Sequence, residues 1–212
     1  MKKTPLALGT FAFVLLFIIG SIFSLLWFFK PGPEIRNYPS AGKDIIAFGD
    51  SLVEGIGSTA GGGFVPILSE RIGRRIVNLG RSGDTTASGL ARVEEIFRYD
   101  PQVVILVLGG NDFLRKIAQE TTFANLERII ERVQEKGAIV LLLGVKGTLL
   151  GDKAESYFKE LSERRGTAYV PNILDGIFGK PGLMYDSIHP NDAGYTRIAD
   201  RLYPELKKLI DS

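Results

Sequence analysis

The fold follows from residues 103–112, which read Val-Val-Ile-Leu-Val-Leu-Gly-Gly-Asn-Asp. Six aliphatic residues in a row, three of them β-branched valines and one an isoleucine, predict a strand that is covered on both faces, as in a parallel sheet. Two glycines end the run, and a polar Asn-Asp pair follows. In open parallel sheets, ligands bind at the carboxyl ends of the strands. The residues just after each strand are therefore where a site is expected.

Four further apolar runs share this pattern, and helix-like stretches separate them. The runs cover residues 44–48, 76–79, 138–143 and, more weakly, 168–170, and a glycine directly follows each of the first three. Strands that alternate with helices predict an α/β protein, a three-layer α/β/α sandwich around a parallel sheet of five strands.

The helix patterns also predict boundaries. Thr121 or Thr122 is expected to cap a helix that ends before Gly137, and residues 151–166 form a similar unit. The last helix is expected to begin near Asn191 or Asp192. Pro204 is expected to break or kink it, leaving residues 205–210 as a separate turn. The buried faces are predicted to consist of Leu126, Ile129, Ile130 and Val133 in the first of these helices and of Tyr195, Ile198 and Leu202 in the last.

The N-terminus has a different composition. Residues 6–29 carry no charge, and as a helix they would span roughly 36 Å, more than the ~30 Å hydrocarbon core of a bilayer. Bulky residues at 26–29 do not match the small-residue exit of a cleaved signal peptide. Residues 1–30 are therefore predicted to be one uncleaved transmembrane helix.

The charges around this segment suggest an orientation. Lys2 and Lys3 precede it, which favours an N-terminus inside the cell and a single-pass protein whose catalytic domain is extracytoplasmic, on the periplasmic or extracellular side. Residues 31–43, rich in proline and glycine, are expected to be a linker, and residues 44–212 the globular domain.

Composition excludes several function classes. Without the three lysines of residues 1–30, 23 of the 26 basic residues remain against 24 acidic ones, and no basic run occurs. Nucleic-acid binding is therefore not expected. The chain has no cysteine, which excludes disulfides, thiolate metal sites and a cysteine nucleophile.

His189 is the only histidine of the chain, so any imidazole base must be this residue. Asp186, three residues earlier, could accept the Nδ1 proton and stabilise the imidazolium. Two alternatives stay open at this point: a surface histidine in the loop before a helix, and a metal pair, which would lack a clear third ligand.

Ser51 is the candidate nucleophile. It directly follows the first predicted strand in Phe48-Gly49-Asp50-Ser51-Leu52, where free main-chain N–H groups could support a hydroxyl and a developing oxyanion. The alternative is a serine that only caps a helix. The chain contains no Gly-x-Ser-x-Gly elbow, which argues against the α/β-hydrolase arrangement.

Two more strand ends carry polar or flexible groups. Gly83 follows the second strand and Asn111 the third, and both could supply N–H donors to the same edge, although turn glycines and a capping Asn are the simpler reading of each alone. Residues 55–60 fit a loose dinucleotide-binding pattern. They begin too far after the strand, and no acid ends the second strand, so this reading is rejected.

Taken together, these segments resemble the SGNH, or GDSL, hydrolase family, in its bacterial arylesterase, lysophospholipase and thioesterase-like branch. The resemblance lies in four blocks in order: Gly49-Asp50-Ser51-Leu52, Gly83, Gly109-Gly110-Asn111-Asp112, and Asp186-x-x-His189-Pro190. It implies a flavodoxin-like sheet, Ser51 as nucleophile, His189 as base and Asp186 as its orienting partner. It also implies an oxyanion hole of the Ser51 and Gly83 main chain and the Asn111 amide, with no metal or organic cofactor.

The function expected on these grounds is ester hydrolysis through an acyl-enzyme. The substrate would be a small-molecule or lipid ester, such as an aryl ester or a lysophospholipid. An acyl groove is expected to be lined by the loop after the fourth strand, with Leu149 and Leu150, together with Phe113, Leu114, Ile177, Phe178 and Met184. The alternative is that these side chains only pack beneath a loop. A carbohydrate O-acetylesterase acting on cell-wall or exported glycans is the alternative, and a non-catalytic, membrane-tethered binding domain is the alternative from another class.

Overall fold

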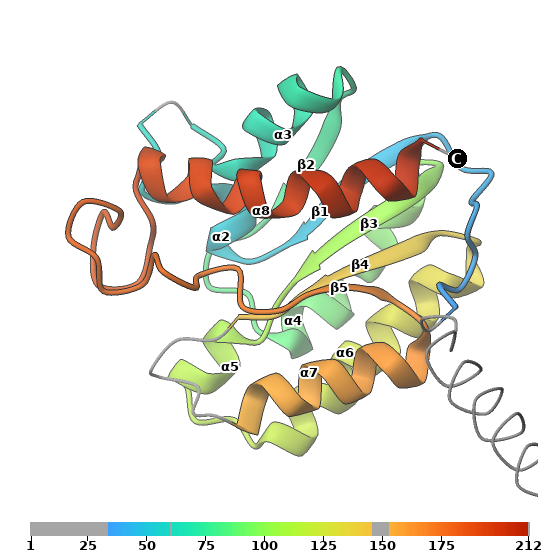
Figure 1. The fold of residues 1–212 in the computed structure, drawn as a ribbon. Coiled ribbons are helices and arrows are strands. Elements are labelled where there is room, and N and C mark those ends of the chain that lie inside the picture. The colour runs from blue at the N-terminus through green and yellow to red at the C-terminus, as the bar shows by residue number, and fades with distance from the viewer. Residues whose placement is uncertain (1–33, 60, 146–152, 212) are drawn as a thin grey trace, which may run out of the picture. The chain divides into compact units, whose positions relative to one another are not determined.

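A parallel five-stranded sheet forms the centre of the protein. The computed structural model describes residues 34–59, 61–145 and 153–211. Its strand order is β2-β1-β3-β4-β5, so the sheet is flavodoxin-like and all neighbours run parallel, as predicted (Figure 1). The strands are β1 (Asp44–Gly49), β2 (Ile76–Gly80), β3 (Pro101–Val107), β4 (Ile139–Leu143) and β5 (Ala168–Val170).

Helices cover both faces of this sheet (Figure 1). The helices α3 (Phe64–Ile72) and α8 (Asp192–Ile210) pack on one face, and α4 (Thr86–Ala91), α6 (Gln119–Glu135) and α7 (Lys153–Arg165) pack on the other. Short helical turns occupy α2 (Ser51–Glu54), α5 (Gly110–Leu114) and the 3-10 helix η1 (Val93–Arg98). The three-layer α/β/α arrangement is confirmed.

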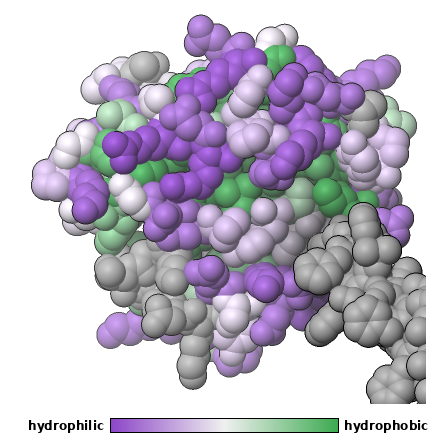
Figure 2. Space-filling model, in the orientation of Figure 1, coloured by the Kyte–Doolittle hydropathy of each residue, from purple (hydrophilic) through white to green (hydrophobic). Residues whose placement is uncertain are grey.

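The two layers of helices enclose two separate cores. Successive side chains of a strand point to opposite faces, so Ile45 and Ala47 of β1 join one core, whereas Ile46 and Phe48 join the other. All four are at most 1% exposed, which explains why the strand sequences are continuously apolar instead of alternating. The outer surface is mostly hydrophilic on the side seen in Figure 2, where apolar side chains show between the polar ones.

The start of α6 differs from the prediction. The helix begins at Gln119, its N-cap is Ala118, and no side chain caps it, so the expected cap at Thr121 or Thr122 is wrong. The Thr122 hydroxyl instead donates to the Asp112 carboxylate at 3.3 Å and to the Ala118 carbonyl at 3.3 Å. The predicted buried face of α6 and the helix end before Gly137 are both confirmed.

The expected break at Pro204 is also wrong, because α8 runs as one helix from Asp192 to Ile210. A proline removes one N–H donor, which costs one helical hydrogen bond. The buried face continues across it, since Leu202, Leu206 and Leu209 are all at most 3% exposed. Packing of that face against the sheet outweighs the lost bond. Asn191 caps the helix, as its predicted start requires, by accepting from the Gly194 N–H at 3.0 Å.

The segment before β1 was expected to be a linker, and residues 35–43 indeed contain neither helix nor strand. They are nevertheless bound to the domain. Arg36 donates its main-chain N–H to Gly166, and the Asn37 side chain donates to the carbonyls of Gln134 and Ala138 at 2.8 and 3.0 Å. By its contacts, the compact unit therefore begins at Ile35.

The predicted transmembrane helix, residues 1–30, lies outside the described residues. Among residues 34–59, 61–145 and 153–211, no helix combines the length and the apolarity that crossing a bilayer requires.

Candidate active site

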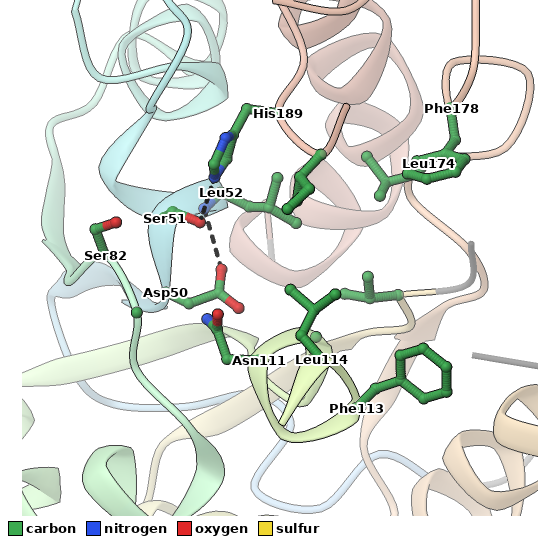
Figure 3. A pocket seen from close by; sticks show the side chains of 14 residues that line it. Asp50, Ser51, Leu52, Ser82, Asn111, Phe113, Leu114, Leu174, Phe178 and His189 are labelled. Carbon is green, nitrogen blue, oxygen red and sulfur yellow. Dashed lines mark hydrogen bonds between the residues drawn. The ribbon is translucent and has the colours of Figure 1, made fainter. Parts of the chain in front are cut away.

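The carboxyl ends of β1, β2 and β3 bring the predicted site residues to one edge of the sheet. Ser51 begins α2 directly after β1, Gly83 lies in the loop after β2, and Asn111 lies in α5 after β3. His189 comes from the loop before α8. All four line one cleft of about 170 Å³, which Figure 3 shows from close by.

The serine, the histidine and the aspartate form a continuous hydrogen-bonded chain. His189 Nε2 lies 3.0 Å from Ser51 Oγ, and His189 Nδ1 lies 2.8 Å from Asp186 Oδ2. The His189 side chain is 17% exposed and Ser51 is 8% exposed, so the imidazole faces the serine and not bulk solvent. The reading of His189 as an unattached surface histidine is therefore excluded.

Asp186 is held in place by the chain that follows it. Its Oδ1 accepts the main-chain N–H groups of Ile188 and His189, both at 2.7 Å. Partial burial of Asp186 favours its neutral form, but the hydrogen bonds from His189 and Ile188 outweigh this and lower the pKa of Asp186 to about 2. The carboxylate is thus ionised wherever an imidazolium could form, and it favours the tautomer with a proton on Nδ1.

A second contact region holds the histidine loop against the serine segment. Asp192, at the start of α8, accepts from the Ser58 hydroxyl at 2.8 Å and from the Thr59 main-chain N–H at 3.0 Å. Tyr195 of α8 is fully buried and donates its hydroxyl to the Ile56 carbonyl at 2.7 Å. The loop that follows α2 is therefore bonded to the start of α8, just beyond His189.

Asp50, and not Ser51, caps α2. Its Oδ1 accepts the Leu52 main-chain N–H at 3.0 Å, so the reading of Ser51 as the capping residue is wrong. Asp50 is 3% exposed and lines the cleft between Ser51 and Asn111 (Figure 3). Burial raises the pKa of Asp50 to about 7, although the Leu52 hydrogen bond and the charge of His189 oppose the shift.

Three donors could face an oxyanion here. The first N–H groups of α2, including that of Ser51, have no acceptor inside the helix. Gly83 has φ +81°, a left-handed conformation that suits glycine and turns its peptide in the loop after β2. The Asn111 side chain lines the cleft and donates one N–H to the Asp84 carbonyl at 2.9 Å.

The other part of the cleft is apolar. Of the residues predicted for an acyl groove, Phe113, Leu114 and Phe178 line it, together with Leu52, Val145, Leu174 and Ile188. Leu149 and Leu150 lie outside the described residues.

Two of the predicted groove residues are placed elsewhere. Met184 does not line the cleft, because it pairs with Pro190 in an isolated bridge and packs against the core that contains α8. Ile177 is fully buried in that same core.

Among the described residues, no group of three or more histidine, aspartate or glutamate side chains is arranged to hold a metal ion. The cleft brings together a hydroxyl beside a base, a carboxylate bonded to the base, and N–H donors in the same wall.

Sequence reasoning missed two residues around the site. The capping role of Asp50 had a signal, because aspartate directly after a strand and before a short helix is a preferred N-cap. Arg92 had none. It is 8% exposed and pairs at 2.6 Å with Asp84, which lies just before the other end of α4.

Comparison with known families and proteins gives one consistent result. The model of the GDSL-like lipase/acylhydrolase family matches residues 47–197, which include Ser51, Gly83, Asn111, Asp186 and His189.

Among curated proteins, the chain is 33% identical to Esterase TesA of Pseudomonas aeruginosa over 183 residues, 81% of this chain and 91% of that protein. It is 28% identical to thioesterase 1/protease 1/lysophospholipase L1 of Escherichia coli strain K12, over 81% of this chain and 87% of that protein. Among solved structures, a crystal structure of TesA superimposes with a TM-score of 0.73 at 33% identity, covering 79% of this chain and all of the other.

Proposed function

This chain belongs to the GDSL-like lipase/acylhydrolase family and is a serine esterase, a carboxylic ester hydrolase, in which we propose that Ser51, His189 and Asp186 form the catalytic triad. The observation that carries the assignment is the 3.0 Å separation of His189 Nε2 from Ser51 Oγ, with Asp186 bonded to the other ring nitrogen at 2.8 Å. Membership of an acylhydrolase family with esterase relatives argues against the non-catalytic binding domain considered from sequence.

The mechanism follows from those contacts. Ser51 Oγ attacks the ester carbonyl while His189 Nε2 takes the hydroxyl proton, which gives a tetrahedral intermediate and an imidazolium stabilised by Asp186. The intermediate breaks its bond to the alcohol oxygen, and His189 returns the proton to that oxygen. Water then attacks the acyl-enzyme with His189 again as base, and release of the carboxylic acid restores Ser51.

The oxyanion of each tetrahedral intermediate is proposed to lie among the N–H groups of Ser51 and Gly83 and the Asn111 side chain. This placement is supported by the presence of Ser51, Gly83 and Asn111 in the lining of one cleft. Donors that are already aimed at the developing charge need no rearrangement during the reaction, which is the source of their effect on rate.

The substrate is proposed to be an aryl ester or a lipid ester with an apolar acyl group. The support is the apolar part of the cleft, which Phe113, Leu114, Leu174 and Phe178 line (Figure 3). An apolar acyl group would remove these side chains from water, and each buried methylene contributes about 0.8 kcal/mol. The alternative, an O-acetylesterase for glycans, would leave most of this surface unused.

Membrane attachment and an extracytoplasmic location of the domain are also proposed. Both depend on the uncharged residues 6–29 and on the lysines that precede them. Attachment near a bilayer would place the cleft close to lipid esters. Partition of the full chain into membrane fractions, and its accessibility to protease in intact cells, test the two statements separately.

The decisive experiment uses the full chain and p-nitrophenyl esters from acetate to octanoate. Wild type is expected to hydrolyse them with a preference for longer acyl groups, and Ser51→Ala to lose turnover and labelling by a fluorophosphonate. Ser82→Ala is the matched control, because Ser82 lines the same cleft without a bond to His189, and it is expected to remain active. Labelling that persists in Ser51→Ala would place the nucleophile elsewhere, and a strict preference for acetate would favour the O-acetylesterase.

A further inference from the structure

Arg92 is a buried cation that the triad does not use. It lies between α4 and η1, is 8% exposed, and has its guanidinium 4.1 Å above the ring of Phe48. Burying an arginine is costly unless its donors are matched with acceptors. Each nitrogen of this guanidinium has one: Nη1 donates to Glu95 Oε2 at 3.3 Å, and the contacts of Nη2 and Nε follow.

One end of the guanidinium reaches the strand that carries the nucleophile. Arg92 Nη2 donates to the main-chain carbonyl of Gly49 at 2.9 Å, two residues before Ser51. The same carbonyl accepts the main-chain N–H of Arg81 at 2.9 Å. Arg92 thereby bonds to the last peptide of β1, the point from which the chain turns toward the Ser51 N–H and Oγ.

The other end reaches the loop after β2. Arg92 Nε donates to Asp84 Oδ2 at 2.6 Å, and Asp84 Oδ1 accepts from Ser88 at 2.8 Å. Asp84 directly follows Gly83, and its main-chain carbonyl accepts the Asn111 side-chain N–H at 2.9 Å. Asp84 therefore orients the Asn111 amide and, as the next residue in the chain, helps to place Gly83, whose carbonyl also accepts from Arg115 at 2.8 Å.

We propose that Arg92 is a positioning residue of the oxyanion hole, which holds the donors of Ser51, Gly83 and Asn111 at fixed mutual distances through Gly49 and Asp84. This inference rests on the proposed function, since it assumes that these three donors face the oxyanion. Arg92 is not among the residues that line the cleft, so it acts through its neighbours and not by touching substrate.

The effect should appear in the transition state more than in substrate binding. The acyl group contacts the apolar part of the cleft, where Arg92 has no hydrogen bond, whereas a donor must lie within about 2.7–3.1 Å of the oxyanion to stabilise it. A loop that shifts by a fraction of an ångström would thus lower kcat and leave KM nearly unchanged.

The fold should survive removal of Arg92, because a separate set of bonds attaches α4 to α5. The Asp112 carboxylate, 1% exposed, accepts the Thr86 main-chain N–H at 2.8 Å and the Thr86 and Thr122 hydroxyls at 2.5 and 3.3 Å. None of these bonds involves Arg92.

The test compares Arg92→Lys and Arg92→Ala in the full chain, with p-nitrophenyl butyrate as substrate. Lysine keeps the positive charge but lacks the planar guanidinium that donates to Gly49 and to Asp84 at the same time. We expect kcat to fall about 10-fold in Arg92→Lys and about 10²-fold in Arg92→Ala, with KM within about 3-fold, because the loss of one whole donor costs ~10²–10³. The rate of fluorophosphonate labelling should fall in parallel.

Arg81→Ala is the matched control, because Arg81 also pairs with Glu95 but has a side chain that is 58% exposed. It keeps its main-chain bond to Gly49 and is expected to retain kcat within about 2-fold, as surface pairs contribute little. Methylguanidinium at millimolar concentration should raise kcat of Arg92→Ala and leave that of Arg81→Ala unchanged.

Three outcomes would overturn the proposal: both Arg92 variants with kcat within 2-fold of wild type, a rise in KM as large as the fall in kcat, or no response of Arg92→Ala to methylguanidinium. If Arg92→Ala does not fold, Arg92→Lys alone decides by its kcat and KM. Failure of the proposed function is distinguishable, because Ser51→Ala would then stay active, whereas failure of this inference alone leaves Ser51→Ala inactive and the Arg92 variants unimpaired.

Discussion

The side-chain amide of Asn111 donates to the main-chain carbonyl of Asp84 at 2.9 Å, which links the end of β3 to the loop after β2. Only the Nδ2 end of an asparagine side chain can donate to a carbonyl, so this bond determines which end of the amide faces Asp84. Nδ2 carries a second N–H, and Asn111 lines the cleft beside Ser51. One bond thus orients the amide and leaves a donor for the oxyanion.

Replacement of Asn111 by alanine should lower kcat by ~10²–10³, because it removes a neutral donor from a preorganised site. KM should change little, since the amide contacts the transition state more than the acyl group. Steady-state kinetics with p-nitrophenyl butyrate measure both constants. Asn125→Ala is the control: Asn125 donates to the Thr86 hydroxyl at 3.2 Å and does not line the cleft. Equal kcat in both variants would show that Asn111 does not belong to the oxyanion hole.

Asp186→Asn should lower kcat by roughly 10²–10⁴. An asparagine can still accept the N–H groups of Ile188 and His189, but it carries no charge to stabilise the imidazolium and can present its own N–H to Nδ1. The control is Asp200→Asn on α8, whose carboxylate is 60% exposed in an ion pair with Arg71. A kcat that falls no further than in this control would show that Asp186 does not orient the base.

The pKa of Asp186 also predicts a stability effect with a definite sign. Its pKa is lowered from 3.8 to about 2 in the folded protein, so its stabilising contribution is present above about pH 4 and is lost as the pH falls from 4 to 2. The difference in free energy of unfolding between wild type and Asp186→Asn should therefore shrink over that range. Urea unfolding at pH 6, 4 and 3 measures it, and a difference that grows toward low pH would contradict the assignment.

The sequence predicted the sheet well because its strands are buried on both faces. A strand such as β3, with every residue from Pro101 to Val107 buried, leaves the continuous apolar run of residues 103–107, which an exposed strand would not show. The site was predictable for a related reason. Ser51, Gly83 and Asn111 each follow a strand, and parallel strands end at one edge.

What the sequence could not predict depends on tertiary contacts. Nothing local indicates that Thr122 turns toward Asp112 instead of capping α6, or that packing of Leu206 and Leu209 carries α8 through Pro204. Met184 and Phe178 have the same apolar character, yet only Phe178 lines the cleft. Whether a loop side chain faces the cleft depends on how the loop lies on the sheet.

Asp50→Asn should change how stability depends on pH. The pKa of Asp50 is raised from 3.8 to about 7 by burial, with Asp84 and Asp112 adding to the rise and His189 and the Leu52 bond opposing it. The folded protein therefore binds a proton that the unfolded chain has released between about pH 4 and pH 7, and stability falls as the pH rises through that range. Asparagine keeps the cap and cannot ionise.

Between pH 4 and pH 7 the free energy of unfolding of wild type is expected to fall by up to about 4 kcal/mol relative to that of Asp50→Asn. Urea unfolding at several pH values measures this difference. Asp100→Asn is the control, because Asp100 is exposed, and the effect of Asp50→Asn is read against it. If the free energies of unfolding of Asp50→Asn and wild type change equally with pH across this range, Asp50 is ionised in the folded protein at pH 4.

Gly57 should be required for the approach of His189 to Ser51. Gly57 has φ +92°, and a Cβ there would lie 2.5 Å from the Pro190 carbonyl oxygen and 2.8 Å from the Tyr185 Cβ, so Gly57→Ala must push away the loop that carries His189. Gly73→Ala separates this clash from backbone strain, since Gly73 has φ +64° and no described atom within 4 Å of such a Cβ. Both variants should lose about 1–2 kcal/mol of stability from the left-handed conformation, but only Gly57→Ala should lose kcat, by at least about 10-fold, because a displacement near 1 Å already costs on the order of 10². Equal kcat in the two variants, measured with p-nitrophenyl butyrate below their unfolding temperatures, would mean that His189 still reaches Ser51 without a glycine at position 57.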